Sequence, residues 1–264
     1  MKKLSAFGYA IADLSSDDRT AMFTLFADYY SNVNAEQFQK DLESKDHVFV
    51  LKDSKSHEIK GFSTIVSLTT HVNGQEIRGL FSGDTVVHHD YWGQGTLGVA
   101  FLKYLFVQKL KKPTQPLYWF LISKGYKTYL LMANNFKTHY PRFETDTPGD
   151  IKQIIDHFAQ TLYPQHYDAQ KGIIQFSDQH ANFKDCLKAD VTPITDDLLA
   201  SNQRIAYFAS QNRRWQQGDE LACVAEMTFS MPIYYQLKIM RKMWRRSLLR
   251  LGFGKKPGRE AELR

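Results

Sequence analysis

Apolar residues recur with two different periods over the first 145 residues of the chain. Runs rich in β-branched and aromatic residues predict strands at 7–11, 48–51, 61–68, 77–88 and 117–122. Apolar residues three or four positions apart predict one helix that ends near residue 29, a second at 35–42 and a third at 96–112. Ser15, Ser16 and Asp17 are candidate N-caps of the first helix. The polar segment 53–60 and the pair Asn73-Gly74 predict hairpin turns between the three middle strands.

The pattern continues past residue 148 without an internal repeat or a low-complexity linker. It predicts a helix between Pro148 and Pro164, a short strand at 172–176, a helix at 196–210 and an apolar run at 221–229. We therefore expect a core at 1–147, an extension packed on that core at 148–232, and a basic amphipathic C-terminal helix and tail at 233–264. With 264 residues, of which 43% are hydrophobic, the chain can bury a large core.

The basic charge of the chain is confined to its C-terminal tail. Residues 238–264 hold ten Lys or Arg and two Glu, a charge of +8, so the total of +6 leaves −2 for the rest. Apolar residues recur three or four apart in and just before this segment, at Ile233, Leu237, Met240, Trp244, Leu248 and Leu251. Such a helix suits an anionic membrane surface or an acidic partner such as an acyl carrier protein, or it docks on the body with a solvated face. The acidic remainder gives no support for a nucleic-acid partner.

The segment 84–98, DTVVHHDYWGQGTLG, carries the most chemistry. A predicted strand enters a glycine-rich turn that opens a helix, and the free N–H groups of such a helix attract a phosphate. Glycine at such a corner also serves tight packing alone. Gly93, Gly95 and Gly98 spell GxGxxG, but a Rossmann dinucleotide site needs this turn near the first strand and an acidic residue after the next one, and neither is present.

The run from Val87 to Leu97 resembles motif A of the GNAT N-acetyltransferase superfamily. His89 stands where proline is usual, Trp92 where arginine or glutamine is usual, and Leu97 where a small residue is usual. The resemblance implies an α+β fold with a mixed, mostly antiparallel central sheet, helices on both faces, and here a C-terminal α/β extension. It also implies acetyl-CoA or another acyl-CoA as co-substrate. The implied CoA-binding residues are Val86, Val87, His88, Trp92, Gly93, Gln94, Gly95, Thr96, Leu97 and Gly98.

In this superfamily the fourth and fifth strands splay apart to admit the pantetheine arm, which here implies a gap between 77–88 and 117–122. The resemblance implies Asp84 as the base that accepts the amine proton, with His88 or His89 as alternatives. It implies Tyr129 as the acid for the leaving thiolate, with Tyr126 as a substitute, although both rings can also serve packing alone. A metal at His88 and His89 is not expected, since adjacent residues of a strand point to opposite faces.

Three functions are consistent with these features. The first is an N-acyltransferase that moves an acyl group, most simply acetyl, from acyl-CoA to a primary amine of a small molecule or peptide. The second takes a long acyl chain from acyl carrier protein or acyl-CoA at the membrane surface, and the third binds a ligand or partner without catalysis, as the changes at Trp92 and Leu97 suggest. Two cysteines and no apolar run of membrane-spanning length favour the cytoplasm, with peripheral attachment at the inner membrane face as the alternative.

Overall fold

The computed structural model describes residues 2–31, 33–175, 186–187, 193–234, 236–237, 240 and 244. Its strands are β1 (Leu4–Ala10), β2 (Tyr30–Ser31), β3 (His47–Asp53), β4 (Ile59–Val72), β5 (Gln75–Val87), β6 (Leu117–Ser123), β7 (His139–Tyr140), β8 (Tyr167–Asp168), β9 (Ile173–Ile174), β10 (Cys186–Leu187) and β11 (Glu220–Glu226). Its helices are α1 (Ser16–Tyr29), α2 (Ala35–Glu43), α3 (Thr96–Lys111), α4 (Tyr126–Asn135), α5 (Gly149–Leu162), α6 (Asp196–Ser201) and α7 (Gln203–Gln211). The elements predicted for the first 122 residues are confirmed in type and order.

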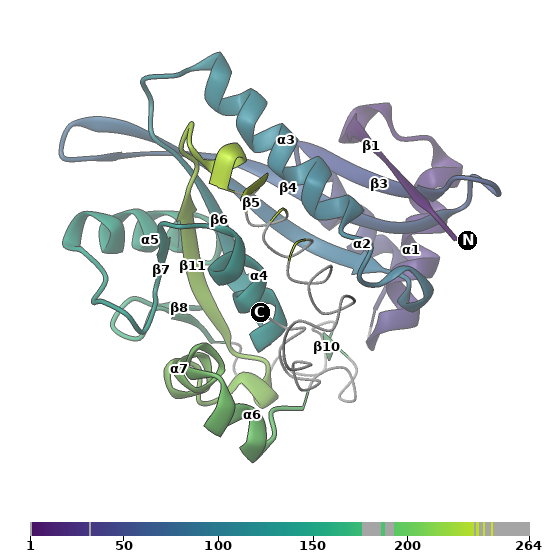
Figure 1. Cartoon of the computed structure of the whole chain (residues 1–264). Helices are drawn as coiled ribbons and strands as arrows, with labels where there is room; N and C mark the ends of the chain where they lie inside the picture. The colour runs from purple at the N-terminus through teal and green to yellow at the C-terminus, as the bar shows by residue number, and fades with distance from the viewer. Residues whose placement is uncertain are drawn as a thin grey trace.

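One sheet runs through the molecule in the order β1-β3-β4-β5-β6-β11-β9-β8, with β7 also paired to β11 (Figure 1). Its long strands are antiparallel to their neighbours except for β5 and β6, which run parallel. β11 belongs to the extension, yet it lies beside β6 in the interior of the sheet. The expected α+β fold with a mixed, mostly antiparallel sheet is confirmed.

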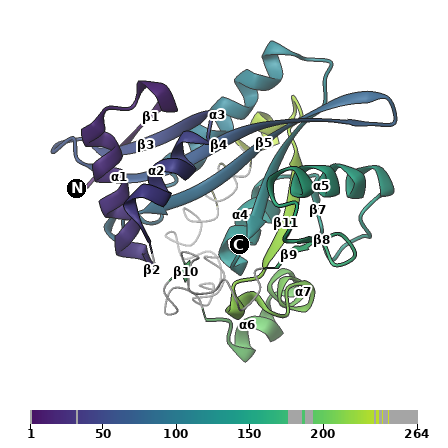
Figure 2. The ribbon, with the colours of Figure 1, turned by 180° about the vertical axis from the view of Figure 1, so that it is seen from behind.

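Helices cover both faces of this sheet, because alternate residues of each strand point to opposite sides. Leu80 of β5 belongs to a core cluster that includes residues of α3, α4 and α7. Its neighbour Phe81 belongs to a cluster built with α5, and Val50 of β3 to one built with α1 and α2. Figure 2 shows α1, α2 and α5 on the side opposite to that seen in Figure 1.

Local signals explain the helix and turn boundaries of the N-terminal half. The Ser15 hydroxyl accepts a hydrogen bond from the Asp18 N–H, and the Asn34 side chain accepts from two N–H groups at the start of α2. Asn73 and Gly74 both have positive φ, 51° and 77°, as a two-residue hairpin turn requires. The predicted N-cap at Ser15 and the predicted turn at Asn73-Gly74 are confirmed.

The single helix predicted at 196–210 is wrong, because the chain forms two helices, α6 and α7, that meet at Asn202. Asn202 leaves the helical region with φ −134° and ψ 103°, and its side chain accepts from the N–H groups of Arg204 and Ile205. It is therefore the N-cap of the second helix, a role for which asparagine is among the preferred residues.

Two other predictions fall partly beyond the described residues. The strand predicted at 172–176 is confirmed for Ile173–Ile174, while Phe176 lies outside them. The C-terminal helix and tail predicted at 233–264 are described only at 233, 234, 236, 237, 240 and 244, all of which are helical. Among the described residues, no helix is both long and apolar enough to span a membrane.

β5 and β6 separate after only four residue pairs. Their parallel ladder runs from Arg78 opposite Leu117 to Phe81 opposite Phe120, and β5 then continues to Val87 beside β4 alone. A bulge lies at this point, since the register of β5 against β4 shifts between Ser63 and Ile65. Bulges bend a strand and increase its twist, which turns β5 away from β6. The gap between the fourth and fifth core strands, implied by the resemblance, is therefore present.

Candidate functional site

The loop between β5 and α3 forms an open cradle of backbone N–H groups. Gly93 and Gly95 have φ of 80° and 72°, a conformation that residues with a Cβ rarely adopt. A Cβ added at Gly93, Gly95 or Gly98 would meet no atom within 4 Å, so these glycines are not required by packing against a neighbour. Gly95 is the N-cap of α3, whose first turn has no acidic residue, so the positive end of the helix faces this space uncompensated.

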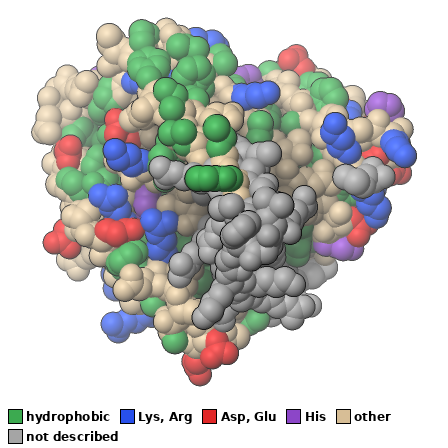
Figure 3. Space-filling model, viewed as in Figure 1, with side chains coloured by type: hydrophobic (Ala, Val, Ile, Leu, Met, Phe, Trp, Pro, Cys, Tyr) green, Lys and Arg blue, Asp and Glu red, His purple; other side chains and the backbone are tan. Residues whose placement is uncertain are grey.

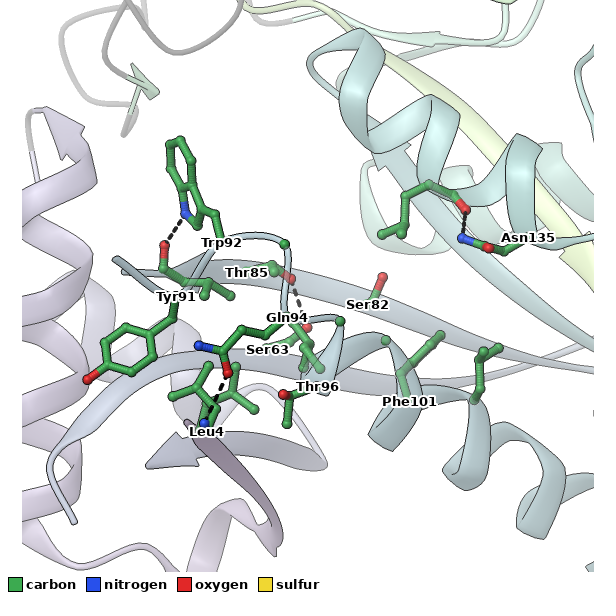
Figure 4. A pocket seen from close by; sticks show the side chains of 18 of the residues that line it. Leu4, Ser63, Ser82, Thr85, Tyr91, Trp92, Gln94, Thr96, Phe101 and Asn135 are labelled. Atoms are coloured by element: carbon green, nitrogen blue, oxygen red, sulfur yellow. Dashed lines mark hydrogen bonds between the residues drawn. The ribbon is translucent and has the colours of Figure 1, made fainter. Parts of the chain in front are cut away.

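The side chain of Gln94 fixes the loop to β1 instead of pointing to a ligand (Figure 4). Its Oε1 accepts from the Leu4 N–H at 3.1 Å, and its Nε2 donates to the Lys2 carbonyl at 3.2 Å. Next to it, the buried Tyr91 hydroxyl donates to Asp53 Oδ2 at 2.8 Å. This bond raises the pKa of Tyr91 to about 12. These contacts hold the cradle in place without using its free N–H groups.

A cavity of about 450 Å³ extends from this loop along the gap between β5 and β6 (Figure 4). Its walls are mainly apolar side chains of β1, β3, β5, α3, β6 and the end of α4, including Leu51, Phe101 and Phe136. The hydroxyls of Ser63, Ser82 and Thr85 are the polar exceptions on its strand side, and Ser63 and Thr85 bond each other at 2.7 Å. An apolar channel with a few fixed polar groups is typical of a small-molecule site.

A second cavity, of about 760 Å³, meets the first from the other side of the gap. It is bounded by the ends of α1 and α5, the segment after α2, the start of α4 and the splayed part of β5. Both cavities are lined by Ser82, Thr85, Val87, Trp92, Trp119 and Leu131. Two molecules that enter from opposite sides can therefore meet at the gap.

Asp84 lines only the second cavity, where it stands half-buried at the bulge of β5. The Thr64 hydroxyl lies 3.5 Å from its Oδ2, a long contact that leaves the carboxylate open to another donor. Asp41 lines the same cavity, and burial followed by the nearby charge of Asp84 raises the pKa of Asp41 above its usual value. The Asp84 carboxylate therefore lies in the second cavity, between Ser82 and Thr85, which line both cavities.

Tyr129 does not reach either cavity. It is 1% exposed, its ring packs near Tyr207 and Phe208 of α7, and its hydroxyl donates to the Pro141 carbonyl at 3.0 Å. Burial raises the pKa of this phenol above its ordinary value, which opposes loss of its proton. Tyr126 is buried in the same core cluster. The cavity-facing stripe of α4 is instead Lys127, Thr128, Leu131 and Asn135.

The CoA-binding residues implied by the sequence fall into three groups. Eight of them line the first cavity: Val87, Trp92, Gly93, Gln94, Gly95, Thr96, Leu97 and Gly98. Val86 lines only the second cavity, because its side chain belongs to the cluster under α1 and α2. His88 lines neither, and its Nδ1 accepts instead from the Asp90 N–H at 3.2 Å. The sequence did not single out Ser63, Ser82, Trp119 or Leu131, which carry no motif of their own.

Trp92 stands at the mouth of the gap. It is 53% exposed, and its indole N–H donates to the Val87 carbonyl at 2.6 Å (Figure 4). The Lys127 ammonium of α4 lies 6.0 Å from the centre of its ring. Trp92 therefore occupies one backbone acceptor of β5 and faces α4 across the opening.

His88 and His89 do not point to opposite faces, so that sequence argument is wrong. A short 3₁₀ helix begins at His89, and the two rings stack at 4.3 Å. Donor atoms of these histidines and Asp90 lie within 4.8 Å of one another, in a geometry that could hold a cation. Other partners already engage them: Asp90 pairs with Lys2, and the Tyr29 hydroxyl lies 3.3 Å from His89 Nδ1.

Comparison with known proteins gives a match in fold only. No family model and no curated protein matches the chain. Similar solved structures include a probable N-acyltransferase of unknown function from Enterococcus faecalis, with 14% identity and a TM-score of 0.36 over 53% of this chain and 34% of that one. An acetyltransferase from Trypanosoma brucei matches with 16% identity and a TM-score of 0.38 over 55% of this chain and 100% of its own.

A GNAT family N-acetyltransferase from Escherichia coli, solved in complex with CoA, matches with 14% identity and a TM-score of 0.33, covering 55% of this chain and 79% of that one. The chain spans about a third of the length of the E. faecalis structure and of a GCN5-related N-acetyltransferase from Kribbella flavida, 34% in each case. At these identities and TM-scores no residue role is transferred from them. The site is therefore defined by the geometry of this chain.

Proposed function

We propose, on the premise of a GNAT superfamily fold, that this chain is an N-acyltransferase that moves an acyl group from an acyl-CoA to a primary amine. One observation carries the proposal. Beyond Phe81 the edge of β5 no longer pairs with β6, and it faces an apolar cavity that ends at the glycine cradle. A pantetheine arm carries amides that pair with such an edge like an added strand. Its pyrophosphate would lie on the N–H groups of Thr96, Leu97 and Gly98, where α3 begins.

The amine would enter through the second cavity and meet the thioester at Asp84. Its nitrogen attacks the carbonyl carbon, the C–N bond forms, and the carbon–sulfur bond breaks to release the thiolate. The Asp84 carboxylate accepts the proton that the amine must lose. This proton then passes through solvent to the thiolate, which becomes the free thiol of CoA. Tyr129 has no role in this scheme, because its hydroxyl lies in the core on the Pro141 carbonyl.

Binding of the donor is the first test. A ligand that binds only the folded state at 100 times its Kd stabilises it by about 2.7 kcal/mol, so CoA, acetyl-CoA and a long-chain acyl-CoA should each raise the melting temperature if they bind. Gly95→Asp should abolish the rise, since a carboxylate would face the pyrophosphate. Gly172→Asp is the matched control, because Gly172 also has positive φ, 68°, and open space around it but lies in the extension. No rise with any donor would refute CoA binding.

Turnover is the second test. Release of free thiol from acetyl-CoA should require a primary amine and give the N-acylated product by mass spectrometry. Thiol release without an acylated amine, or with water alone, would contradict the proposal.

The alternative with a long acyl chain at a membrane is favoured by one further observation. Ile233, Leu237, Met240 and Trp244 are 64%, 49%, 63% and 70% exposed, so this apolar stripe is not buried against the body. Figure 3 also shows hydrophobic side chains on the surface over α3, where Val107 and Leu110 are exposed. The basic residues between the stripe positions would suit anionic lipid.

Sedimentation with vesicles tests this alternative. Binding to anionic but not to neutral vesicles, lost in Leu237→Glu/Met240→Glu, would support it. Transfer of an acyl group from acyl carrier protein by a chain that does not bind vesicles would favour the carrier protein as the partner instead. A protein that binds CoA but never acylates an amine would favour the non-catalytic alternative. The structural reason for that alternative is that the Trp92 indole N–H occupies the Val87 carbonyl of β5.

A further inference from the structure

The inner end of the first cavity is closed by a bond between two side chains across the gap. The strand ladder ends at Phe81 opposite Phe120, and Ser82 is the next residue of β5. Its hydroxyl accepts a hydrogen bond at 2.8 Å from the indole N–H of Trp119, the β6 residue that pairs with Leu80 in the ladder. Trp119 is 5% exposed and lines both cavities. Its indole therefore spans the apex of the gap.

Aromatic contacts hold this indole in place from the α3 and α4 side. Its ring centre lies 5.0 Å from that of Phe101 on α3 and 5.2 Å from that of Phe136 at the end of α4. Rotation of the ring would break its hydrogen bond and these contacts together. The end of the cavity is thus a fixed wall and not a flexible side chain.

The wall stands where the acyl group of the donor would lie. β5 covers about 16 Å from Val87 to Ser82, at about 3.3 Å per residue. A donor arm that follows this edge inward from the glycine cradle brings its thioester near Asp84 and Ser82. Acyl carbons beyond the first one or two after the carbonyl then meet the indole of Trp119.

We propose that Trp119, fixed by Ser82, restricts the donor to short acyl groups such as acetyl and propionyl. The inference rests on the proposed function, and it names the acyl class that the site accepts. Replacing the indole with a smaller apolar side chain would extend the cavity into the space between Phe101 and Phe136. The channel would then accept a chain that the native enzyme rejects.

The test measures kcat/KM for acetyl-CoA and octanoyl-CoA and takes their ratio, which does not depend on the fraction of active protein. The native chain should favour acetyl-CoA, and Trp119→Leu should shift the ratio toward octanoyl-CoA by at least tenfold, because a single methylene in an apolar pocket is worth about 10–200-fold. Ser82→Ala removes the acceptor of the indole N–H but leaves the Trp119 ring in the protein. It should therefore give a smaller shift of the ratio in the same direction.

A matched control separates specificity from stability. Phe158→Leu also truncates a buried aromatic residue, but Phe158 belongs to α5, packs on the other face of the sheet and lines neither cavity. It should lower the melting temperature and leave the ratio unchanged. If Trp119→Leu does not fold, the Ser82→Ala ratio still decides, since it leaves the core volume nearly intact.

The inference and the proposed function fail in different ways. A native chain that uses octanoyl-CoA as well as acetyl-CoA, or variants that leave the ratio unchanged, would overturn the inference while acyl transfer stands. A chain whose melting temperature no form of CoA raises would overturn both.

Discussion

At the scale of single residues, the site depends most on Asp84. Its carboxylate lies in the second cavity, between Ser82 and Thr85, which line both cavities, and among the described residues its hydrogen-bond contact is a long one to the Thr64 hydroxyl. Asp84→Asn keeps the shape but removes the proton acceptor, so kcat should fall by about 10²- to 10⁴-fold. The CoA-induced rise in melting temperature should persist, because Asp84 does not line the cavity that contains the glycine cradle.

Two variants serve as controls for this prediction. Asp41→Asn changes the charge of the same cavity without touching the base, so its kcat should stay within a few-fold of the native value. Tyr129→Phe should likewise retain turnover, with a stability loss of about 1 kcal/mol from its bond to the Pro141 carbonyl. Equal losses of kcat in Asp84→Asn and Tyr129→Phe would contradict the placement of both residues.

The Asp53–Tyr91 pair makes the stability of the folded state depend on pH in the acid range. The Ser56 and Lys55 N–H groups and the Tyr91 hydroxyl donate to the Asp53 carboxylate and lower its pKa to about 2. The folded state therefore gains stability that is present above the ordinary aspartate pKa of about 4 and is lost as the pH falls through about 2. Urea midpoints measured from pH 5 to pH 2 should fall less steeply in Asp53→Asn than in the native chain.

Tyr91→Phe removes one of the three donors, so the pKa of Asp53 in the folded state moves closer to its unfolded value. Less stability should therefore be lost on acidification than in the native chain, and the loss should be complete at a higher pH. Superimposable profiles of all three proteins would show that this pair does not determine the pH dependence in the acid range. At the alkaline end the sign reverses, because the raised pKa of Tyr91 keeps its contribution intact below pH 10 and loses it as the pH rises through about 12.

At the scale of elements, the bulge in β5 creates the gap, and Gly83 permits the bulge. A Cβ at Gly83 would lie 2.7 Å from the Thr64 Oγ1 on β4, closer than real Cβ contacts allow. Gly83→Ala should cost about 1–3 kcal/mol by overpacking and weaken the CoA-induced thermal shift. Adding Thr64→Ala to Gly83→Ala removes the clashing atom. The double variant should regain most of the lost stability, measured by urea unfolding, and most of the CoA-induced thermal shift. Failure of this rescue would mean that the bulge does not depend on that contact.

The sequence predicted elements well where their signals are local, and failed where the phase of a helix depends on a distant partner. Ser15 and Asn73-Gly74 act through neighbouring residues, so the cap and the turn that they form could be predicted from the sequence. Tyr129 lies on the core side of α4 and lines neither cavity, because that side of the helix packs against α7, about 80 residues later. The histidine pair was misread because the strand ends one residue earlier than predicted, at Val87.

At the scale of the whole molecule, the core and the extension share one sheet. β11 pairs with β6 from Leu221 opposite Ser123 to Glu226 opposite Tyr118, and its residues Leu221–Ala225 are at most 1% exposed. No local pattern predicts which strand an apolar run will pair with, because pairing between strands about 100 residues apart leaves no periodic signal in the sequence. The sequence could therefore predict the strand but not its place beside the gap.

This placement predicts that the core does not fold alone. A chain that ends at residue 147 would expose the edge of β6 and the apolar side chains that β11 covers, including Phe120 and Leu121, which are at most 1% exposed. It should show no cooperative unfolding in urea and rapid proteolysis, whereas the full chain should unfold cooperatively. A chain that ends at residue 232 keeps β11 and should retain the CoA-induced thermal shift. If the chain of 147 residues folds and binds CoA, the extension is an independent addition, and the wall at Trp119 is set by the core alone.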